Sequence, residues 1–247
     1  MRLPPSLPRP GLRARRLSLF LLAALLALLP GGCARLPAEE AADGPAASAA
    51  RTGFAALSAH GVPLGSALAV APDRLLTNAH VLPEGATRLQ ARRGDGAAVV
   101  EAVVLARSPG MDLAVLAVAP GVFLPVPRQA GPPRQGQAIW AIGAPAAGPA
   151  LAQGVVEQPE TVLGGRGPGF TARIGALMGY SGGPALDAEG RVRGLVTALL
   201  RAGAAPALAA LTGVDVVGLS QTREGREVFI LSIDAAMHES ERIAPRN

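Results

Sequence analysis

Short apolar segments, each bounded by glycine, proline or aspartate, are the feature that most limits the folds open to this chain. Eight segments of four to eight residues follow one another after residue 60: Ala67–Val70, Arg74–Thr77, Val99–Leu105, Leu113–Val118, Ile139–Ile142, Gly194–Leu199, Val214–Leu219 and Val228–Ile233. Their length and valine content favour β-strands over helices. Many short strands with few helical stretches predict an all-β barrel or sandwich.

Two further segments differ from the predicted strands. Pro125–Gln137 holds four prolines and few large apolar side chains, which is typical of a connection between two halves. Ile233–Ile243 is predicted to be a helix, because Asp234 lies near its start and Arg242 in its last turn, where each charge complements the helix dipole.

The N-terminal residues 1–32 are predicted to be an export signal. Arginines precede an apolar run, Leu17–Leu29, that is interrupted only by Ser18. This run is shorter than the ~20 residues that a membrane-spanning helix needs. Pro30, Gly31, Gly32 and Cys33 follow, and this sequence resembles a bacterial lipobox, in which the cysteine is lipidated. Ordinary signal cleavage after Ala34 is the alternative.

The predicted organisation after the export signal is a flexible tether over 33–52 and a folded part over 53–247. The tether is rich in alanine, with proline, glycine and serine. We expect an exported protein of the cell envelope or periplasm, attached to the membrane only through a lipid on Cys33.

Charge and composition exclude several function classes. The formal net charge is +5, and the five arginines of the export signal supply all of it, so the rest of the chain is neutral. A neutral chain lacks the basic face that nucleic-acid binding requires. The chain has no lysine and one cysteine, which excludes Schiff-base chemistry, an internal disulfide framework and a cysteine-rich metal site. We expect no metal and no organic cofactor.

Three motifs contain the candidate catalytic residues, and they follow one another along the chain in the order His, Asp, Ser. They are Thr77-Asn78-Ala79-His80-Val81, Asp112-Leu113-Ala114-Val115-Leu116 and Gly179-Tyr180-Ser181-Gly182-Gly183-Pro184. These strings resemble those of the trypsin-like serine peptidases, and most closely the bacterial HtrA/Deg branch with its TNAHV, DLAVL and GNSGGP strings. The resemblance covers about residues 60–235.

The resemblance implies a fold of two six-stranded antiparallel β-barrels, with the site in the cleft between them. The first barrel would cover about 53–124, the crossover 125–137, and the second barrel with a short C-terminal helix 138–247. HtrA-type proteins commonly carry a PDZ domain after the protease domain. Fewer than 15 residues follow Ile233, so we expect none here.

The same motifs predict an acyl-enzyme peptidase that acts on protein or peptide substrates. A serine hydroxyl needs a neighbouring base, and neutral imidazole has suitable basicity near pH 7. His80 would be this base, Asp112 would fix its tautomer, and Ser181 would be the nucleophile. The backbone N–H groups of Gly179 and Ser181 would form the oxyanion hole.

The substrate pocket is expected to be apolar. In this fold its walls come from the segments Thr171–Met178 and Gly194–Leu199, and neither contains an acid. The candidate lining residues are Ile174, Leu177, Val196, Thr197 and Ala198. A buried basic side chain would lack a counter-charge there, so cleavage after small or medium aliphatic residues is expected.

One residue departs from the family pattern, and two other functions compete with the peptidase. Tyr180 stands where the family has Asn or Asp, which leaves open how the loop is set in its active shape. The string Gly179–Gly183 also fits the G-x-S-x-G nucleophile elbow of esterases, with Asp215 and His238 downstream, although no helix is expected after it. The third hypothesis is a catalytically silent lipoprotein that uses the protease fold as a binding module.

Overall fold

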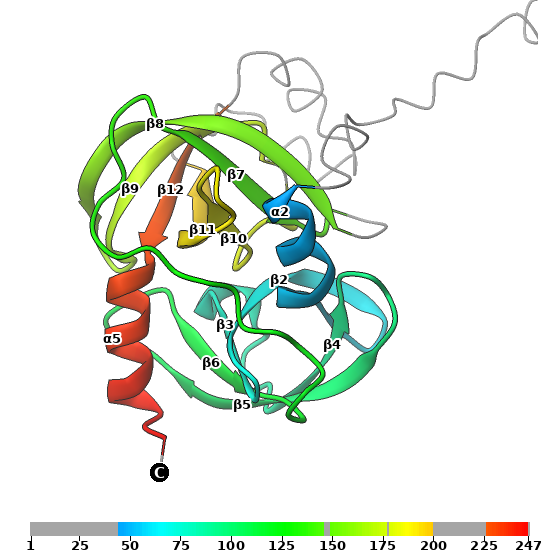
Figure 1. Cartoon of the computed structure of the whole chain (residues 1–247). Helices are drawn as coiled ribbons and strands as arrows, with labels where there is room; N and C mark the ends of the chain where they lie inside the picture. The colour runs from blue at the N-terminus through cyan, green and yellow to red at the C-terminus, as the bar shows by residue number, and fades with distance from the viewer. Residues whose placement is uncertain (1–43, 146–148, 177, 200–225, 247) are drawn as a thin grey trace, which may run out of the picture. The chain divides into compact units, whose positions relative to one another are not determined.

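The chain forms two closed antiparallel barrels of six strands each (Figure 1). The computed structural model describes residues 44–145, 149–176, 178–199 and 226–246. The first barrel has the order β1-β2-β3-β6-β5-β4, and its strands are β1 Phe54–Ala59, β2 Val62–Ala71, β3 Arg74–Thr77, β4 Arg88–Arg93, β5 Val99–Arg107 and β6 Ala114–Ala117. The second has the order β10-β11-β12-β9-β8-β7, with β7 Ala138–Gly143, β8 Ala150–Leu163, β9 Gly167–Ile174, β10 Pro184–Leu186, β11 Val192–Leu199 and β12 Arg226–Ser232. The helix α5, Ile233–Ile243, follows β12. Two six-stranded barrels and the C-terminal helix are therefore confirmed.

The observed strands β4 and β8 were not predicted, because they lack the apolar runs by which other strands were identified. In β4 the buried Leu89 and Ala91 alternate with exposed polar side chains, and β8 has one buried residue in fourteen. Such strands expose one face to solvent and contain no continuous apolar segment. The segment Val214–Leu219, expected to be a strand, lies outside the described residues.

A core shared by the two barrels fixes their relative position. Phe54, Leu68 and Leu76 of the first barrel belong to the same buried cluster as Leu195 and Phe229 of the second. All five side chains are fully buried. Burying a side chain of this size stabilises the folded state by about 1.5–3 kcal/mol. Each barrel also has its own core, and that of the first contains six alanines among its fourteen buried residues.

Residues 45–53, at the end of the stretch expected to be a flexible tether, are folded. They form the short helix α2, Pro45–Ser48, and the π-helical turn η1, Ala49–Gly53. Ala47 and Ala49 are buried, and the backbone N–H of Asp95 donates to Arg51 O. Alanine-rich sequence predicted flexibility, but small side chains also allow close packing against the barrel.

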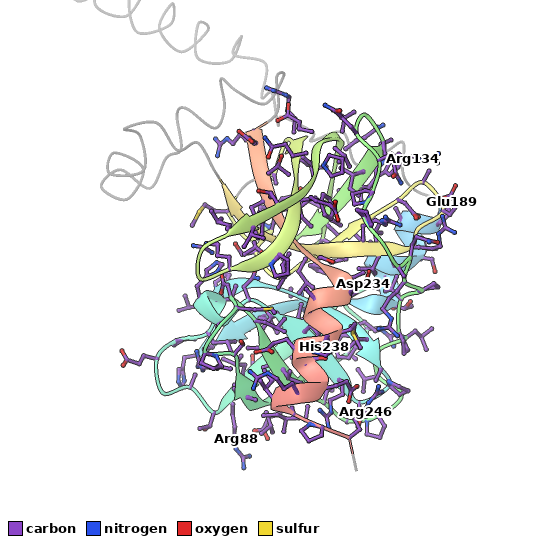
Figure 2. The ribbon with its side chains drawn as sticks, turned by 90° about the vertical axis from the view of Figure 1, so that its left-hand side faces the viewer. Arg88, Arg134, Glu189, Asp234, His238 and Arg246 are labelled. Carbon is purple, nitrogen blue, oxygen red and sulfur yellow. The ribbon has the colours of Figure 1, made fainter. Side chains whose placement is uncertain are left out.

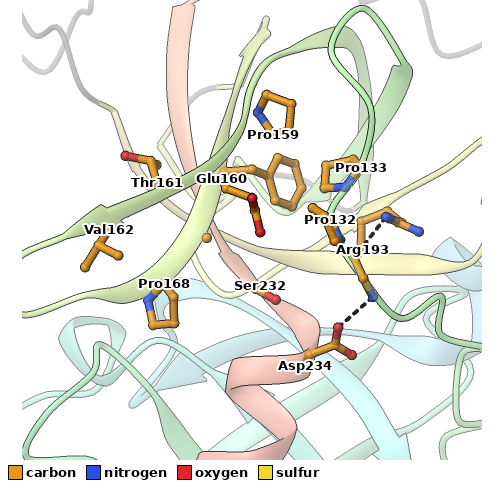
Figure 3. A pocket seen from close by; sticks show the side chains of 13 residues that line it. Pro132, Pro133, Pro159, Glu160, Thr161, Val162, Pro168, Arg193, Ser232 and Asp234 are labelled. Atoms are coloured by element: carbon orange, nitrogen blue, oxygen red, sulfur yellow. Dashed lines mark hydrogen bonds between the residues drawn. The ribbon is translucent and has the colours of Figure 1, made fainter.

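The connection between the barrels is held to the second barrel and to α5 by polar contacts. Arg193 of β11 donates to Gly131 O at 2.8 Å, and Gly131 N donates to Asp234 at the start of α5 at 2.7 Å. Figure 3 shows these contacts at the edge of a pocket of about 440 Å³, whose 13 lining residues include four prolines. None of the predicted site residues lines this pocket.

The helix α5 also contacts the first barrel. Its Glu239 is 5% exposed and accepts a hydrogen bond from Ser108, whose hydroxyl oxygen accepts the N–H groups of Gly110 and Met111. Hydrogen bonds from Arg242 outweigh the effect of burial and lower the pKa of Glu239 to about 2. The turn before Asp112 is thus braced by an ionised carboxylate from α5. Among the described residues, no helix has the length and apolar character needed to cross a membrane.

Tyr180 anchors the loop that contains Ser181. Its ring is 3% exposed and packs in the core of the second barrel with Ile139, Val156 and Ile230. A Cβ atom on Gly143 of β7 would lie 2.3 Å from Tyr180 Cγ, so glycine is required for this approach. Burial raises the pKa of the Tyr180 hydroxyl to about 12. The residue that departs from the family pattern therefore holds the loop by apolar packing.

Removing the Tyr180 ring should destabilise the second barrel. Tyr180→Ala is expected to lower the free energy of unfolding by about 3–5 kcal/mol, as for other buried aromatic residues. Tyr180→Phe, which keeps the ring, is the matched control and should retain most of the stability. Urea denaturation followed by the fluorescence of Trp140, the single tryptophan, measures both variants. An unchanged free energy for Tyr180→Ala would show that the ring does not anchor the loop.

Candidate active site

Strand pairing brings His80 and Asp112 together. The last residue of β3, Thr77, pairs with the first residue of β6, Ala114, in an antiparallel register. The residues that follow Thr77 therefore run beside those that precede Ala114. His80 lies in the 3-10 turn η2, Ala79–Val81, directly after β3.

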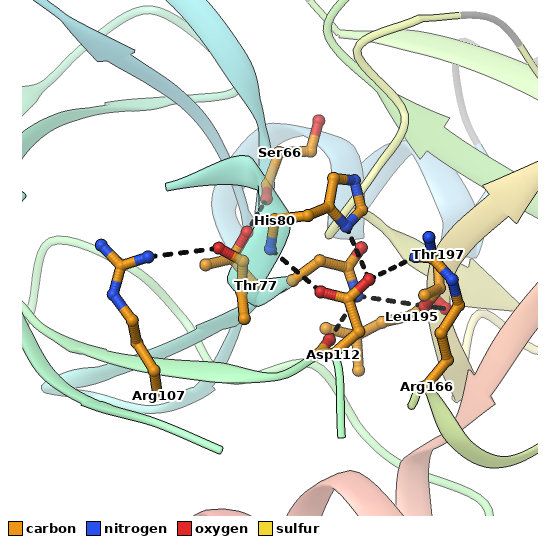
Figure 4. A network of polar contacts seen from close by, with 10 residues as sticks. Ser66, Thr77, His80, Arg107, Asp112, Arg166, Leu195 and Thr197 are labelled. Carbon is orange, nitrogen blue, oxygen red and sulfur yellow. Dashed lines mark hydrogen bonds and ion pairs between the residues drawn. The ribbon is translucent and has the colours of Figure 1, made fainter. Parts of the chain in front are cut away.

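The Asp112 carboxylate binds both the ring and the backbone of His80 (Figure 4). Oδ2 lies 2.6 Å from His80 Nδ1, and Oδ1 accepts the His80 backbone N–H at 3.0 Å. Asp112 is buried, whereas 42% of the His80 side chain is exposed. When Asp112 is ionised, the proton of the neutral ring resides on Nδ1, which leaves Nε2 as an acceptor.

The environment of Asp112 favours its ionised form. Burial acts to raise the pKa of this carboxyl, but hydrogen bonds from the His80 ring and backbone, with the charges of His80 and Arg166, outweigh it and hold the pKa below its usual value. Asp112 is therefore a carboxylate at neutral pH, as a tautomer-fixing role requires.

Asn78 connects this corner of the first barrel to the second. Its side-chain Nδ2 donates to Asp112 O at 2.9 Å and to the hydroxyl of Thr197 on β11 at 3.0 Å. The Thr197 hydroxyl in turn donates to Leu195 O. Asn78 and Thr197 are both buried, so these bonds fix the corner against β11.

Ser66 of β2 holds the loop that carries Ser181. Its backbone N–H donates to Ser181 O at 2.9 Å, and its hydroxyl donates to Gly179 O at 2.7 Å. Ala144 N also donates to Gly179 O, at 3.1 Å. A first-barrel serine thus fixes the backbone of a second-barrel loop.

The two backbone N–H groups predicted for the oxyanion hole have no hydrogen-bond acceptor among the described residues. Within the described part of the chain, neither Gly179 N nor Ser181 N donates a hydrogen bond. Gly179 has φ +94°, and a Cβ there would lie 2.4 Å from Ala144 O. Glycine is therefore required at this position, and two donors remain for a ligand oxygen.

The Ser181 loop lies against the segment that leads to His80. A Cβ atom on Gly182 would lie 2.3 Å from Thr77 Oγ1 and 3.2 Å from Asn78 N. The fold thus brings all three predicted motifs to one boundary between the barrels. No hydrogen bond joins Ser181 Oγ to His80, both of which the structure describes.

The predicted pocket residues are only partly described. Ile174 and Val196 are buried in the core of the second barrel, and the Thr197 hydroxyl is bound to Asn78. The side chains of Leu177 and Ala198, like Cys33, lie outside the described residues. Among the residues that the structure describes, no group of three His, Cys, Asp or Glu side chains could hold a metal.

Most of the residues that connect the barrels are not marked by any pattern in the sequence. Ser66 and Arg166 belong to none of the three motifs, and Asn78 lies inside a motif that assigns it no role. Arg166 Nη1 lies 2.5 Å from Asp112 Oδ2. Only Asn78 gave a signal, because it lies inside the His80 string.

The loop geometry removes the nucleophile-elbow alternative. After Gly183 the chain enters the strand β10, Pro184–Leu186, and not a helix. An elbow of that type requires a strand followed directly by a helix in an α/β sheet. The two closed barrels contain no such unit in the described ranges.

Comparison with solved structures supports the fold. The chain matches the active form of the Rv3671c protease from M. tuberculosis with a TM-score of 0.63 at 23% identity, covering 82% of this chain and 86% of that chain. It matches the HtrA-type protease AlgW, solved with a decapeptide, with a TM-score of 0.64 at 22% identity, covering 81% of this chain and 66% of that chain.

Comparison with known sequences gives the family. Serine protease Rv3671c from Mycobacterium tuberculosis (strain ATCC 25618 / H37Rv) is 31% identical over an alignment of 145 residues, and the match covers 53% of this chain and 35% of the relative. The match thus spans about a third of the relative's length. The family model of the trypsin-like peptidase domain matches residues 65–195, more than half of the chain. The protein therefore belongs to the trypsin-like peptidase family, as its three motifs predicted.

Proposed function

We propose that this protein is an exported serine endopeptidase that hydrolyses peptide bonds with a triad of His80, Asp112 and Ser181. The observation that carries the proposal is the hydrogen bond of 2.6 Å between His80 Nδ1 and the buried Asp112 carboxylate, beside the Ser181 loop. Membership of the trypsin-like peptidase family supports it.

The proposed reaction begins with the transfer of one proton. His80 Nε2 takes the hydroxyl proton of Ser181 while Oγ bonds to the substrate carbonyl carbon, and the carbonyl electron pair moves onto oxygen. The N–H groups of Gly179 and Ser181 stabilise this oxyanion, and losing one such donor costs about 3–4 kcal/mol. The imidazolium then gives its proton to the leaving nitrogen as the C–N bond breaks. Water hydrolyses the remaining acyl ester by the same steps.

The resting geometry is compatible with this role. Ser181 Oγ makes no hydrogen bond to His80 in the described structure, and catalytic hydrogen bonds often tighten only when substrate binds. The loop itself is held by Ser66 and Tyr180, which lie outside the proton-transfer path. Contacts within this chain thus hold the backbone of the loop.

The proposed substrates are extended peptides with a small or medium aliphatic residue before the scissile bond. AlgW, which shares the fold, was solved with a decapeptide. The two segments expected to flank the pocket contain no acid, so a basic side chain would be buried without a counter-charge. One methylene in an apolar pocket discriminates by only about 1–3 kcal/mol, so the preference should be broad.

Casein digestion tests the proposal with matched variants. The wild-type protein should cleave casein, whereas Ser181→Ala and His80→Ala should each lose nearly all activity, because members of a triad act as a unit. Arg88→Gln, a surface variant on β4, is the control and should cleave normally. The folded state of each variant is checked by circular dichroism.

Mass spectrometry of the released peptides gives the residue before each cut. Aliphatic residues should dominate at this position, and dominant cleavage after Arg or Lys would mean that the pocket is misplaced. Turnover that persists in Ser181→Ala would overturn the triad. A wild-type protein that neither digests casein nor reacts with a fluorophosphonate would favour the catalytically silent binding module.

We also propose that Cys33 carries a lipid that anchors the mature protein in the cell envelope. The support is the sequence alone: an acid-free leader, the apolar run Leu17–Leu29 and the small residues before Cys33. Metabolic labelling with palmitate should mark the wild-type protein and not Cys33→Ser. A mature protein that begins at Arg35 would instead show ordinary signal cleavage.

A further inference from the structure

Arg166 reaches the proposed triad from the opposite barrel. It lies in the turn between β8 and β9, flanked by Gly165 and Gly167, whose φ angles are +71° and +93°. A Cβ on Gly167 would lie 3.0 Å from the side chain of Met111, so this turn packs against the residue before Asp112. Arg166 Nη1 donates to Asp112 Oδ2 at 2.5 Å (Figure 4).

Arg166 and His80 share one carboxylate oxygen. Oδ2 accepts both the guanidinium N–H and the N–H of His80 Nδ1, while Oδ1 accepts the His80 backbone N–H. The carboxylate is 8% exposed, so these bonds are largely shielded from water. Three donors therefore fix its rotation, and one of them carries a full positive charge.

We propose that Arg166 is a positioning residue that fixes the Asp112 carboxylate toward His80 and offsets part of its negative charge. The inference rests on the proposed function, since it concerns the same triad. Its physical basis is that the guanidinium offsets the carboxylate charge that would otherwise stabilise an imidazolium. It also ties the first-barrel half of the site to the second barrel.

The other charged side chains near this corner form hydrogen bonds with groups other than the Asp112 carboxylate. Arg107 of β5 donates to the carbonyl oxygens of Ala79, Leu82, Pro83 and Ala86. Glu239 of α5 is bonded to Ser108 and Arg242. Among the described residues, Arg166 is the only cation besides a protonated His80 that contacts the Asp112 carboxylate.

The exposure of the Arg166 side chain limits how far its removal can shift the pH–rate profile. Because 34% of the Arg166 side chain is exposed, solvent and salt screen part of its charge. We therefore expect that removing the charge moves the acidic limb of the pH–rate profile about 0.5–1 unit toward higher pH, at the low end of charge effects on nearby groups. At a pH on that limb, the rate should fall about 3- to 10-fold.

The test measures how fast a fluorophosphonate labels Ser181 across a pH series from about 5 to 9. The proteins are wild type, Arg166→Gln, Arg166→Lys and the control Arg88→Gln. Arg88 pairs with Glu101 at the edge of the first barrel, so its loss also removes one positive charge (Figure 2). We expect the shift in Arg166→Gln, partial recovery in Arg166→Lys, and a wild-type profile in Arg88→Gln.

Two results would overturn the inference. One is a profile of Arg166→Gln that superimposes on wild type, and the other is a loss that is equal at every pH, which indicates a structural role alone. Failure of the proposed function is distinguishable, because the wild-type protein itself would then show no labelling that depends on Ser181.

Discussion

The contact between the two barrels is the constraint on which the site depends. The shared apolar core packs first-barrel side chains such as Phe54 and Leu76 against Leu195 and Phe229 of the second. Polar contacts cross the same boundary: Ser66 binds the Ser181 loop, Asn78 binds Thr197, and Arg166 binds Asp112. A small shift between the barrels would break both the apolar and the polar contacts that cross the boundary. The geometry of the site therefore depends on the packing of the barrels.

The two halves of the proposed site are held by different physical means. The His80–Asp112 half is fixed by charge-assisted hydrogen bonds, which a buried carboxylate makes strong. The Ser181 half is fixed by backbone hydrogen bonds to Ser66 and by the buried Tyr180 ring. Neither Gly179 N nor Ser181 N is used in holding the described loop. The loop is therefore restrained without consuming the donors that would stabilise an oxyanion.

The sequence predicted what lies within local strings, and missed what depends on distant packing. The motifs around His80, Asp112 and Ser181 are contiguous, and α5 was predicted with its observed limits because its end charges are local signals. Ser66 and Arg166 are single polar residues whose partners lie far away in the chain, so no spacing pattern marks them. The strands β4 and β8 were not predicted because one face of each is exposed and the apolar pattern is weak. The folded structure of residues 45–53 was not predicted because alanine occurs both in flexible tethers and in closely packed segments.

A crystal structure of the protein after reaction with a phosphonate would show whether the proposed triad and oxyanion hole act together, because the phosphoryl oxygen stands in for the oxyanion. The account predicts a covalent bond from Ser181 Oγ to phosphorus, with the phosphoryl oxygen about 2.7–3.1 Å from both Gly179 N and Ser181 N. It also predicts that His80 Nε2 lies within hydrogen-bonding distance of the adduct while Nδ1 stays on Asp112. A phosphonate attached to another residue, or a phosphoryl oxygen turned away from both N–H groups, would contradict the account.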